Sequence, residues 1–168
     1  YTPREFVGAD SVNAALRRFR DRYAGDQAPP ATSRALYREL QAITPDSLRP
    51  LLSDLFEHIT LWDIRADSSR ADAVGDGTYR LSLFVDVSKV RADSVGRQTP
   101  TPMTDLIEVG VFAPADGEGD GKPLYLKQHR LRSGKQVIVL SVPGRPARAG
   151  LDPYRKMIER DRENNVVD

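Results

Sequence analysis

The sequence predicts an α+β fold in which about three helices precede an antiparallel β-sandwich. Up to residue 58, apolar residues recur at spacings of three and four, which is typical of amphipathic helices. After residue 58 they alternate with polar residues, and Gly, Pro and Asp separate short segments, which is typical of strands. We therefore expect a helical segment at 1–58, a β-sandwich domain at 59–152 and a C-terminal tail at 153–168.

Three apolar stripes predict the helices. Asp10 precedes the first stripe, and its carboxylate is expected to cap that helix. The second stripe follows a Gly- and Pro-containing linker, Gly25–Ser33, whose end is expected to cap the next helix. The third stripe follows Thr44-Pro45, and Pro50 fits there if the helix starts near Ser47 or is kinked. The stripes are Val12, Ala15, Leu16, Phe19 and Tyr23; Leu36, Tyr37, Leu40 and Ile43; and Leu51, Leu52, Leu55, Phe56 and Ile59.

The alternating pattern is clearest in a strand at Tyr79–Ser88, where Phe84 alone interrupts the polar face. Asp76-Gly77 predicts a hairpin turn that links this strand back to one at Ile59–Ile64. Five or more antiparallel strands at this spacing favour an immunoglobulin-like sandwich, although the Cys…Trp…Cys signature of antibody domains is absent. The other expected strands are Leu106–Phe112, Leu124–Leu131, Val137–Val142 and a short piece at Arg145–Leu151.

Composition limits the classes of function. The chain has 168 residues and a formal net charge of +1, so it has no general attraction to nucleic acid or to anionic membranes. It has no cysteine, which excludes disulfides, thiolate zinc ligands and thiol nucleophiles. Its longest apolar runs, such as Val137–Leu140, are far shorter than the roughly 20 residues of a membrane helix. The first residue is Tyr1 and not Met, so we expect a piece excised from a longer chain.

The motifs of common active sites are missing from the sequence. The two histidines, His58 and His129, do not form the H-E-x-x-H pattern of zinc peptidases, and Gly-x-Ser-x-Gly does not occur. The acidic segment Asp116–Gly121 lacks the glutamate of a calcium loop and the Ser/Thr of a phosphate loop, so we expect a solvated hairpin loop. We predict no catalytic, cofactor-binding or metal-ligating residue. Acidic residues are interleaved with the basic ones near the C-terminus, which favours a solvated face there: Arg145, Arg148, Arg155, Lys156, Arg160 and Arg162.

Six segments of the sequence together resemble one known protein family. They are Phe6–Phe19, Thr44–Leu48, Asp54–Asp63, Lys122–Leu126, Pro146–Tyr154 and Ile158–Val166. In their order and spacing they resemble the C-terminal region of bacterial aminopeptidase N-type (gluzincin) zinc metallopeptidases, above all those in which the peptidase is fused to an ABC-transporter permease. The resemblance covers nearly the whole chain apart from the loops around 66–77 and 113–121.

The resemblance implies a non-catalytic structural or accessory domain of a membrane-associated zinc aminopeptidase. In that family the zinc ligands, the H-E-x-x-H and the catalytic tyrosine precede the helix at Phe6, and Tyr1 corresponds to a tyrosine just after the catalytic one. The expected partner is thus the catalytic domain of the same polypeptide, which would hold the zinc. The parent would lie in a bacterial inner membrane, on a side that the sequence does not specify.

Two other readings follow from the residues alone. The chain could be a free-standing immunoglobulin-like binding or adhesion module, or a hydrolase acting alone, for which we find no convincing site. The aminopeptidase reading, in contrast, predicts that an apolar surface of the helical segment stays exposed where the catalytic domain would pack. The residues concerned are Val12, Leu16, Phe19, Leu36, Leu40, Leu51, Leu55 and Phe56.

Overall fold

The computed structural model describes residues 2–25, 28–117 and 119–168. Tyr1, Asp26 and Gln27 of the linker, and Glu118 of the acidic loop lie outside the described residues. The chain consists of two compact units, Tyr1–Ile59 and Thr60–Asp168, here called the helical unit and the β unit. Helices precede mostly antiparallel strands, which confirms the α+β class.

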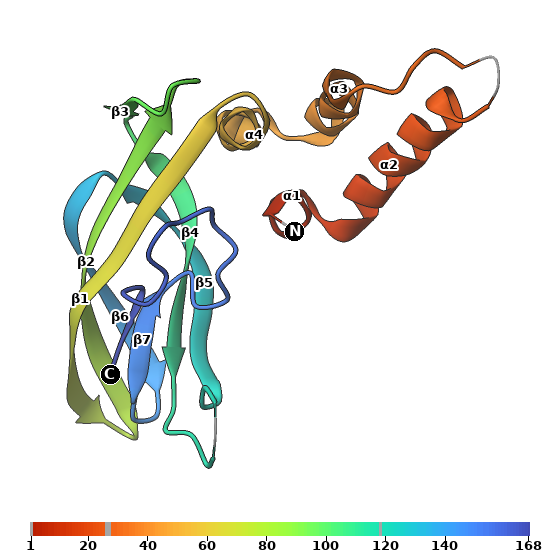
Figure 1. The fold of residues 1–168 in the computed structure, drawn as a ribbon. Helices are drawn as coiled ribbons and strands as arrows, with labels where there is room; N and C mark the ends of the chain where they lie inside the picture. Colours follow the sequence, from red (N-terminus) through yellow and green to blue (C-terminus); the bar gives the residue numbers. More distant parts are fainter. Residues whose placement is uncertain (1, 26–27, 118) are drawn as a thin grey trace. The chain divides into compact units, whose positions relative to one another are not determined.

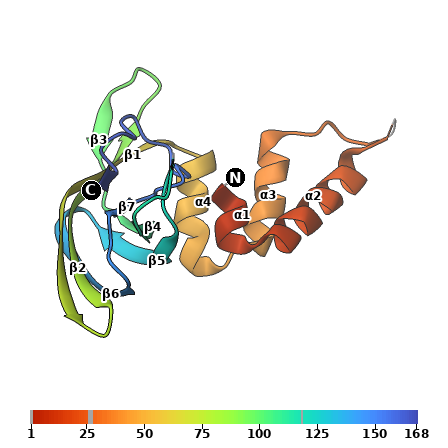
Figure 2. The same ribbon diagram turned by 90° about the horizontal axis from the view of Figure 1, so that it is seen from below.

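The helical unit contains the three expected helices and two shorter turns of helix (Figure 1). Helices α2 and α3 lie side by side (Figure 2), and together with α4 they form a small core of Ala15, Leu40 and Leu52. Glu39 on α3 is buried and forms ion pairs with two arginines of α2, Arg18 at 3.2 Å and Arg22 at 2.9 Å. The elements are α1 (Thr2–Val7), α2 (Ala9–Tyr23), α3 (Ser33–Ile43), a 3-10 helix η1 (Asp46–Leu48) and α4 (Arg49–Phe56).

The start of α2 differs from the expected one, whereas the start of α3 agrees with the cap expected at the end of the linker. Asp10 lies inside the first turn of α2, and Gly8 holds the cap position with φ 92°, a conformation that glycine adopts without steric cost. The cap of α3 is Thr32, whose Oγ1 accepts a hydrogen bond from Ala35 N at 3.1 Å. Pro50 is accommodated as foreseen, because α4 begins at Arg49 and the proline lies in its first turn.

The β unit contains two sheets (Figure 1). One sheet has the order β1-β2-β3, with β6 also paired to β2, and the other has the order β5-β4-β7-β8. The turn between β1 and β2 lies at Asp76 and Gly77 with φ of 50° and 70°, as the sequence predicts. The strands are β1 (Ile59–Gly75), β2 (Thr78–Ala92), β3 (Gln98–Pro100), β4 (Thr104–Phe112), β5 (Pro123–Arg132), β6 (Gly134–Pro143), β7 (Arg148–Leu151) and β8 (Val166–Val167).

The first strand is much longer than the sequence indicates. We expected a loop around residues 66–77, but β1 continues to Gly75. Its distal half is exposed on both faces, so it carries no alternating apolar pattern that could have revealed a strand.

The inward faces of both sheets supply the core of the β unit. On β2, Leu81, Leu83, Val85 and Val87 are buried, as the alternation predicts. A polar contact crosses this core: Trp62 Nε1 on β1 donates to Asp105 on β4 at 2.8 Å. Lys89 on β2 pairs with the same carboxylate at 3.1 Å. The two sheets are therefore tied together by hydrogen bonds as well as by apolar packing.

The C-terminal segment, residues 152–168, is part of the sandwich. The backbone N–H groups of Trp62 and Ala66 on β1 donate to the carbonyls of Ile158 and Asn164, each at 3.0 Å. Between them, Ile64 N donates to the buried carboxylate of Glu159, which also accepts from Asn165 Nδ2. The segment then returns to the second sheet, where β8 pairs with β7. It thereby occupies the edge of β1 in one sheet and the edge of β7 in the other.

Candidate functional site

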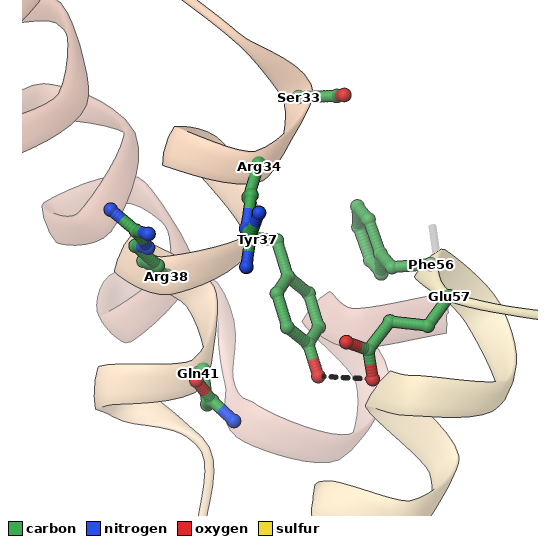
Figure 3. Close-up of a pocket in the computed structure, with 7 residues that line it drawn as sticks. All are labelled: Ser33, Arg34, Tyr37, Arg38, Gln41, Phe56 and Glu57. Carbon is green, nitrogen blue, oxygen red and sulfur yellow. Dashed lines mark hydrogen bonds between the residues drawn. The ribbon is translucent and has the colours of Figure 1, made fainter.

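A hollow of the helical unit lies between α3 and the end of α4 (Figure 3). Its volume is about 490 Å³, and it is open to solvent. Tyr37 from α3 and Phe56 from α4 form its aromatic part, with ring centroids 5.8 Å apart. It is lined by Ser33, Arg34, Tyr37, Arg38, Gln41, Phe56 and Glu57, which we call the α3–α4 groove.

Glu57 is held in a fixed position in the α3–α4 groove. Its Oε2 accepts hydrogen bonds from Tyr37 Oη at 2.9 Å and from Ser53 Oγ at 2.7 Å. The Ser53 hydroxyl and then the Tyr37 hydroxyl lower the pKa of Glu57, so it is a carboxylate at neutral pH. Burial and the bond to Glu57 raise the pKa of Tyr37. The phenol therefore stays protonated and acts as a donor, which suits a binding surface better than a nucleophile.

Two cations border this groove. Arg34 and Arg38 are one turn apart on α3, and neither forms an ion pair with any residue in the described ranges. Several other arginines of the helical unit do have carboxylate partners, as Arg20 has Asp21 and Arg49 has Asp46. The groove thus presents aromatic rings beside two guanidinium groups, of which Arg34 also lowers the pKa of Glu57; this combination favours contact with an apolar and acidic surface.

Further apolar side chains are exposed on the helical unit. Leu16 is 44% exposed and Phe56 is 42% exposed, although both belong to stripes that predict a core. Of the eight apolar residues expected to face a partner, Leu40 and Leu51 are buried, and the remaining four are half-buried: Val12, Phe19, Leu36 and Leu55. The structure therefore leaves part of this set accessible and packs the rest inside the unit.

The histidines lie apart from the groove's hydrogen bonds. His58 follows α4 and is exposed. His129 lies on β5 opposite Ile107, and its Nε2 is 2.6 Å from Tyr125 Oη. Burial, and then the nearby Lys127, lower the pKa of His129, so it is a neutral imidazole at pH 7. In the described part of the chain, the structure contains no group of three His, Asp or Glu side chains able to hold a metal ion.

The charged segments of the sequence mostly form ion pairs. Asp120 of the acidic loop pairs with Arg148. Arg155 pairs with Glu163 at 3.0 Å, and Lys156 pairs with the half-buried Glu108 at 3.1 Å. Of these three ion pairs, the one between Lys156 and Glu108 fastens the C-terminal segment to β4 of the second sheet.

Sequence reasoning did not identify the groove. Tyr37 and Phe56 were assigned to core stripes, and a stripe does not reveal which of its members lies at an end of the bundle. The pair Arg34 and Arg38 was the available signal, because no acidic residue lies three or four positions from either of them, at 30, 31, 35, 37, 41 or 42.

Among the described residues, every helix is too short or too polar to cross a membrane. Neither a protein-family model nor a curated protein matches this chain.

Proposed function

We propose that the chain is a non-catalytic structural or accessory part of a membrane-associated zinc aminopeptidase and that its helical unit packs against the catalytic domain. The observation that carries this proposal is the exposure of Leu16 and Phe56, two side chains from the apolar stripes of the helices. In a bundle complete by itself, such stripes face inward. The resemblance of the sequence to the peptidase family supplies the identity of the partner.

The α3–α4 groove supports the same proposal. Its aromatic rings are accessible, and Arg34 and Arg38 are available to meet carboxylates on another surface. Exposed aromatic and arginine side chains supply much of the binding energy at protein interfaces. The zinc and the catalytic residues belong, in this proposal, to the catalytic domain.

We propose further that the β unit is immunoglobulin-like. Strands β1, β2, β4, β5, β6, β7 and β8 can be lettered A to G. One sheet is then A-B-E and the other is D-C-F-G. Immunoglobulin constant domains have the sheets A-B-E-D and C-F-G. The two arrangements differ in strand D, which is β5 here and pairs with C instead of E; the short strand β3 has no counterpart in this lettering. This correspondence of strand order supports the assignment.

The proposal is tested by binding. The catalytic domain encoded in the same polypeptide is expressed with its zinc, and its affinity for this chain is measured by calorimetry. We expect binding that Leu16→Lys and Phe56→Lys each weaken at least tenfold, about 1.4 kcal/mol. Val95→Lys is the matched control, because Val95 is exposed on the β2–β3 loop. Absence of such a domain from the polypeptide, or equal binding by all variants, would contradict the proposal.

The alternative function is a free-standing immunoglobulin-like binding or adhesion module. It is favoured by apolar side chains on the outer face of the β unit, Phe84, Val137 and Val139. This alternative predicts that the chain does not bind a peptidase domain and that the Leu16 and Phe56 substitutions change no binding at all.

A further inference from the structure

Strand β6 is an unprotected edge of the first sheet. It pairs with β2 along Thr78–Val87, and in the described ranges its other side pairs with no strand. Such an edge presents unpaired backbone N–H and C=O groups that another strand can pair with. Between Lys135 and Pro143, β6 has no charged residue and no proline.

The other edges of the β unit are blocked or charged. The C-terminal segment occupies β1 at Trp62, Ile64 and Ala66. The distal half of β1 carries alternating charges at Asp67, Arg70 and Asp72, which discourage pairing. The exposed edge strand β5 carries several positive charges, β8 is two residues long, and β3 is three residues long and ends at Pro100. Among these edge strands, β6 thus combines an uncovered edge with a long segment that carries no charge.

An apolar face accompanies this edge. The register places Phe84 opposite Val137 and Ser82 opposite Val139, on the outward side of the sheet. Phe84 is 40% exposed, Val137 52% and Val139 59%. The residues between them, Ile138 and Leu140, point inward and are buried. A strand that pairs with β6 would cover the two valines as well as satisfy the backbone groups.

We infer that two copies of this chain associate by antiparallel pairing of β6 with β6. Directly opposite residues of an antiparallel pair point to the same face, so outward residues must meet outward residues. On β6 these are the odd-numbered ones, so the two-fold axis must pass through a residue and not between two residues.

The side chains select the centre of the pairing. An axis at Ile138 places Val137 of each copy opposite Val139 of the other, and Lys135 opposite Ser141. An axis at Val137 would instead place Lys135 opposite Val139, and an axis at Val139 would place Val137 opposite Ser141. The Ile138 register forms two valine–valine pairs beside the two Phe84 rings and brings no like charges together. The sequence of β6 is therefore complementary to itself, which is why the occupant is a second copy.

The first experiment measures the mass of the full chain by sedimentation equilibrium up to about 100 µM. The chain has a mass of 18.7 kDa, and we expect a concentration-dependent rise towards twice that value. Val139→Lys should weaken the association at least about tenfold, because lysine on an edge strand opposes pairing. Circular dichroism and thermal unfolding check that the variant is folded.

Two matched controls locate the interface. Val95→Lys and Leu16→Lys place the same charge at exposed positions that do not belong to β6, and both variants should dimerise like the unaltered chain. A monomer at every concentration would overturn the inference and leave β6 as an edge for a different extended chain. Dissociation by Leu16→Lys and not by Val139→Lys would also overturn it.

The second experiment tests the register without relying on stability. The chain has no cysteine, so single variants Val137→Cys and Val139→Cys introduce one thiol each. Under mild oxidation, a mixture of the two variants should form a cross-linked dimer. In the proposed register, residue 137 of one copy lies directly opposite residue 139 of the other, within the roughly 4.4–6.8 Å that separates the two Cα atoms of a disulfide. Either variant alone should cross-link much less. Equal cross-linking in all three samples, or none in the mixture, would overturn the proposed pairing.

Discussion

The two units of the chain are stabilised in different ways. The helical unit has a small core of Ala15, Leu40 and Leu52 and an ion-pair cluster at Glu39, and it leaves Leu16 and Phe56 exposed. The β unit buries large side chains such as Trp62 and Phe112, and its C-terminal segment occupies the edges of both sheets. The β unit thus has the larger buried core, whereas the exposed apolar side chains of the helical unit fit our proposal that a partner covers them.

The largest effect is expected from the core of the β unit. Trp62→Ala should lower the free energy of unfolding by about 3–5 kcal/mol, because it removes a fully buried ring and the donor to Asp105. Val95→Ala, an exposed control, should stay within about 0.5 kcal/mol. Urea unfolding followed by far-UV circular dichroism, which does not need the tryptophan signal, measures the free energy of unfolding of both variants. A loss as small as that of Val95→Ala would contradict the view that the core around Trp62 stabilises the β unit.

A close approach of backbones should make one glycine sensitive to substitution. A Cβ at Gly150 would collide with the backbone of Asn165 and Val166, so Gly150→Ala should displace β8 from β7 and cost about 1–3 kcal/mol. At Gly117 an added Cβ meets open space, so Gly117→Ala is the matched control and should be nearly neutral. Thermal unfolding of the pair gives the difference. Equal melting temperatures would show that the C-terminal segment contributes little.

The same segment should make the stability of the β unit depend on pH. Burial raises the pKa of Glu159 to about 7, so the folded state holds a proton that the unfolded chain releases near pH 4.5. The stabilisation is fully present below about pH 4.5 and is lost as the pH rises through 7, by roughly 1–3 kcal/mol. Burial also raises the pKa of Asp152, which acts in the same direction.

Replacement of the carboxyl group separates the two contributions. Glu159→Gln should flatten the fall in unfolding free energy between pH 5 and pH 8 and leave the fall that Asp152 causes as the pH rises above its ordinary pKa of 3.8. Denaturant unfolding at several pH values measures it. A slope that Glu159→Gln does not change would assign the pH dependence to other groups.

The smallest effect is expected at the ion pairs of the helical unit. Glu39→Gln removes the charge that Arg18 and Arg22 share, and we expect a loss of about 1 kcal/mol that shrinks at high salt. Asp21→Asn breaks a more exposed pair with Arg20 and should cost less. A loss from Glu39→Gln that is independent of salt would mean that the contact acts by packing and not by charge.

The local elements of the fold could be predicted from the sequence where a periodic pattern existed. The alternation at Tyr79–Ser88 fixes the buried face of β2, and Asp76-Gly77 identifies the hairpin. The distal half of β1 was missed because both of its faces are polar and exposed. The role of the C-terminal segment was missed because it depends on long-range hydrogen bonds from Trp62 and Ala66, which leave no periodic signal.

The candidate site was less predictable than the fold. The groove depends on two helices meeting so that Tyr37 reaches Glu57, and neither residue has a motif around it. The exposed valines of β6 could be expected from the alternation of Val137–Val142, but a sequence does not show which strand ends at an open edge.

Amide hydrogen exchange of the whole chain tests the difference between the units most directly. We expect amides in α2 and α3 to exchange at least about 100-fold faster than those in the centres of β2 and β4, because sparse packing allows local opening. Addition of the catalytic domain should slow exchange in the helices and leave the strands unchanged. Equal protection of both units in the chain alone would contradict the account, because the helical unit would then be as complete as the β unit.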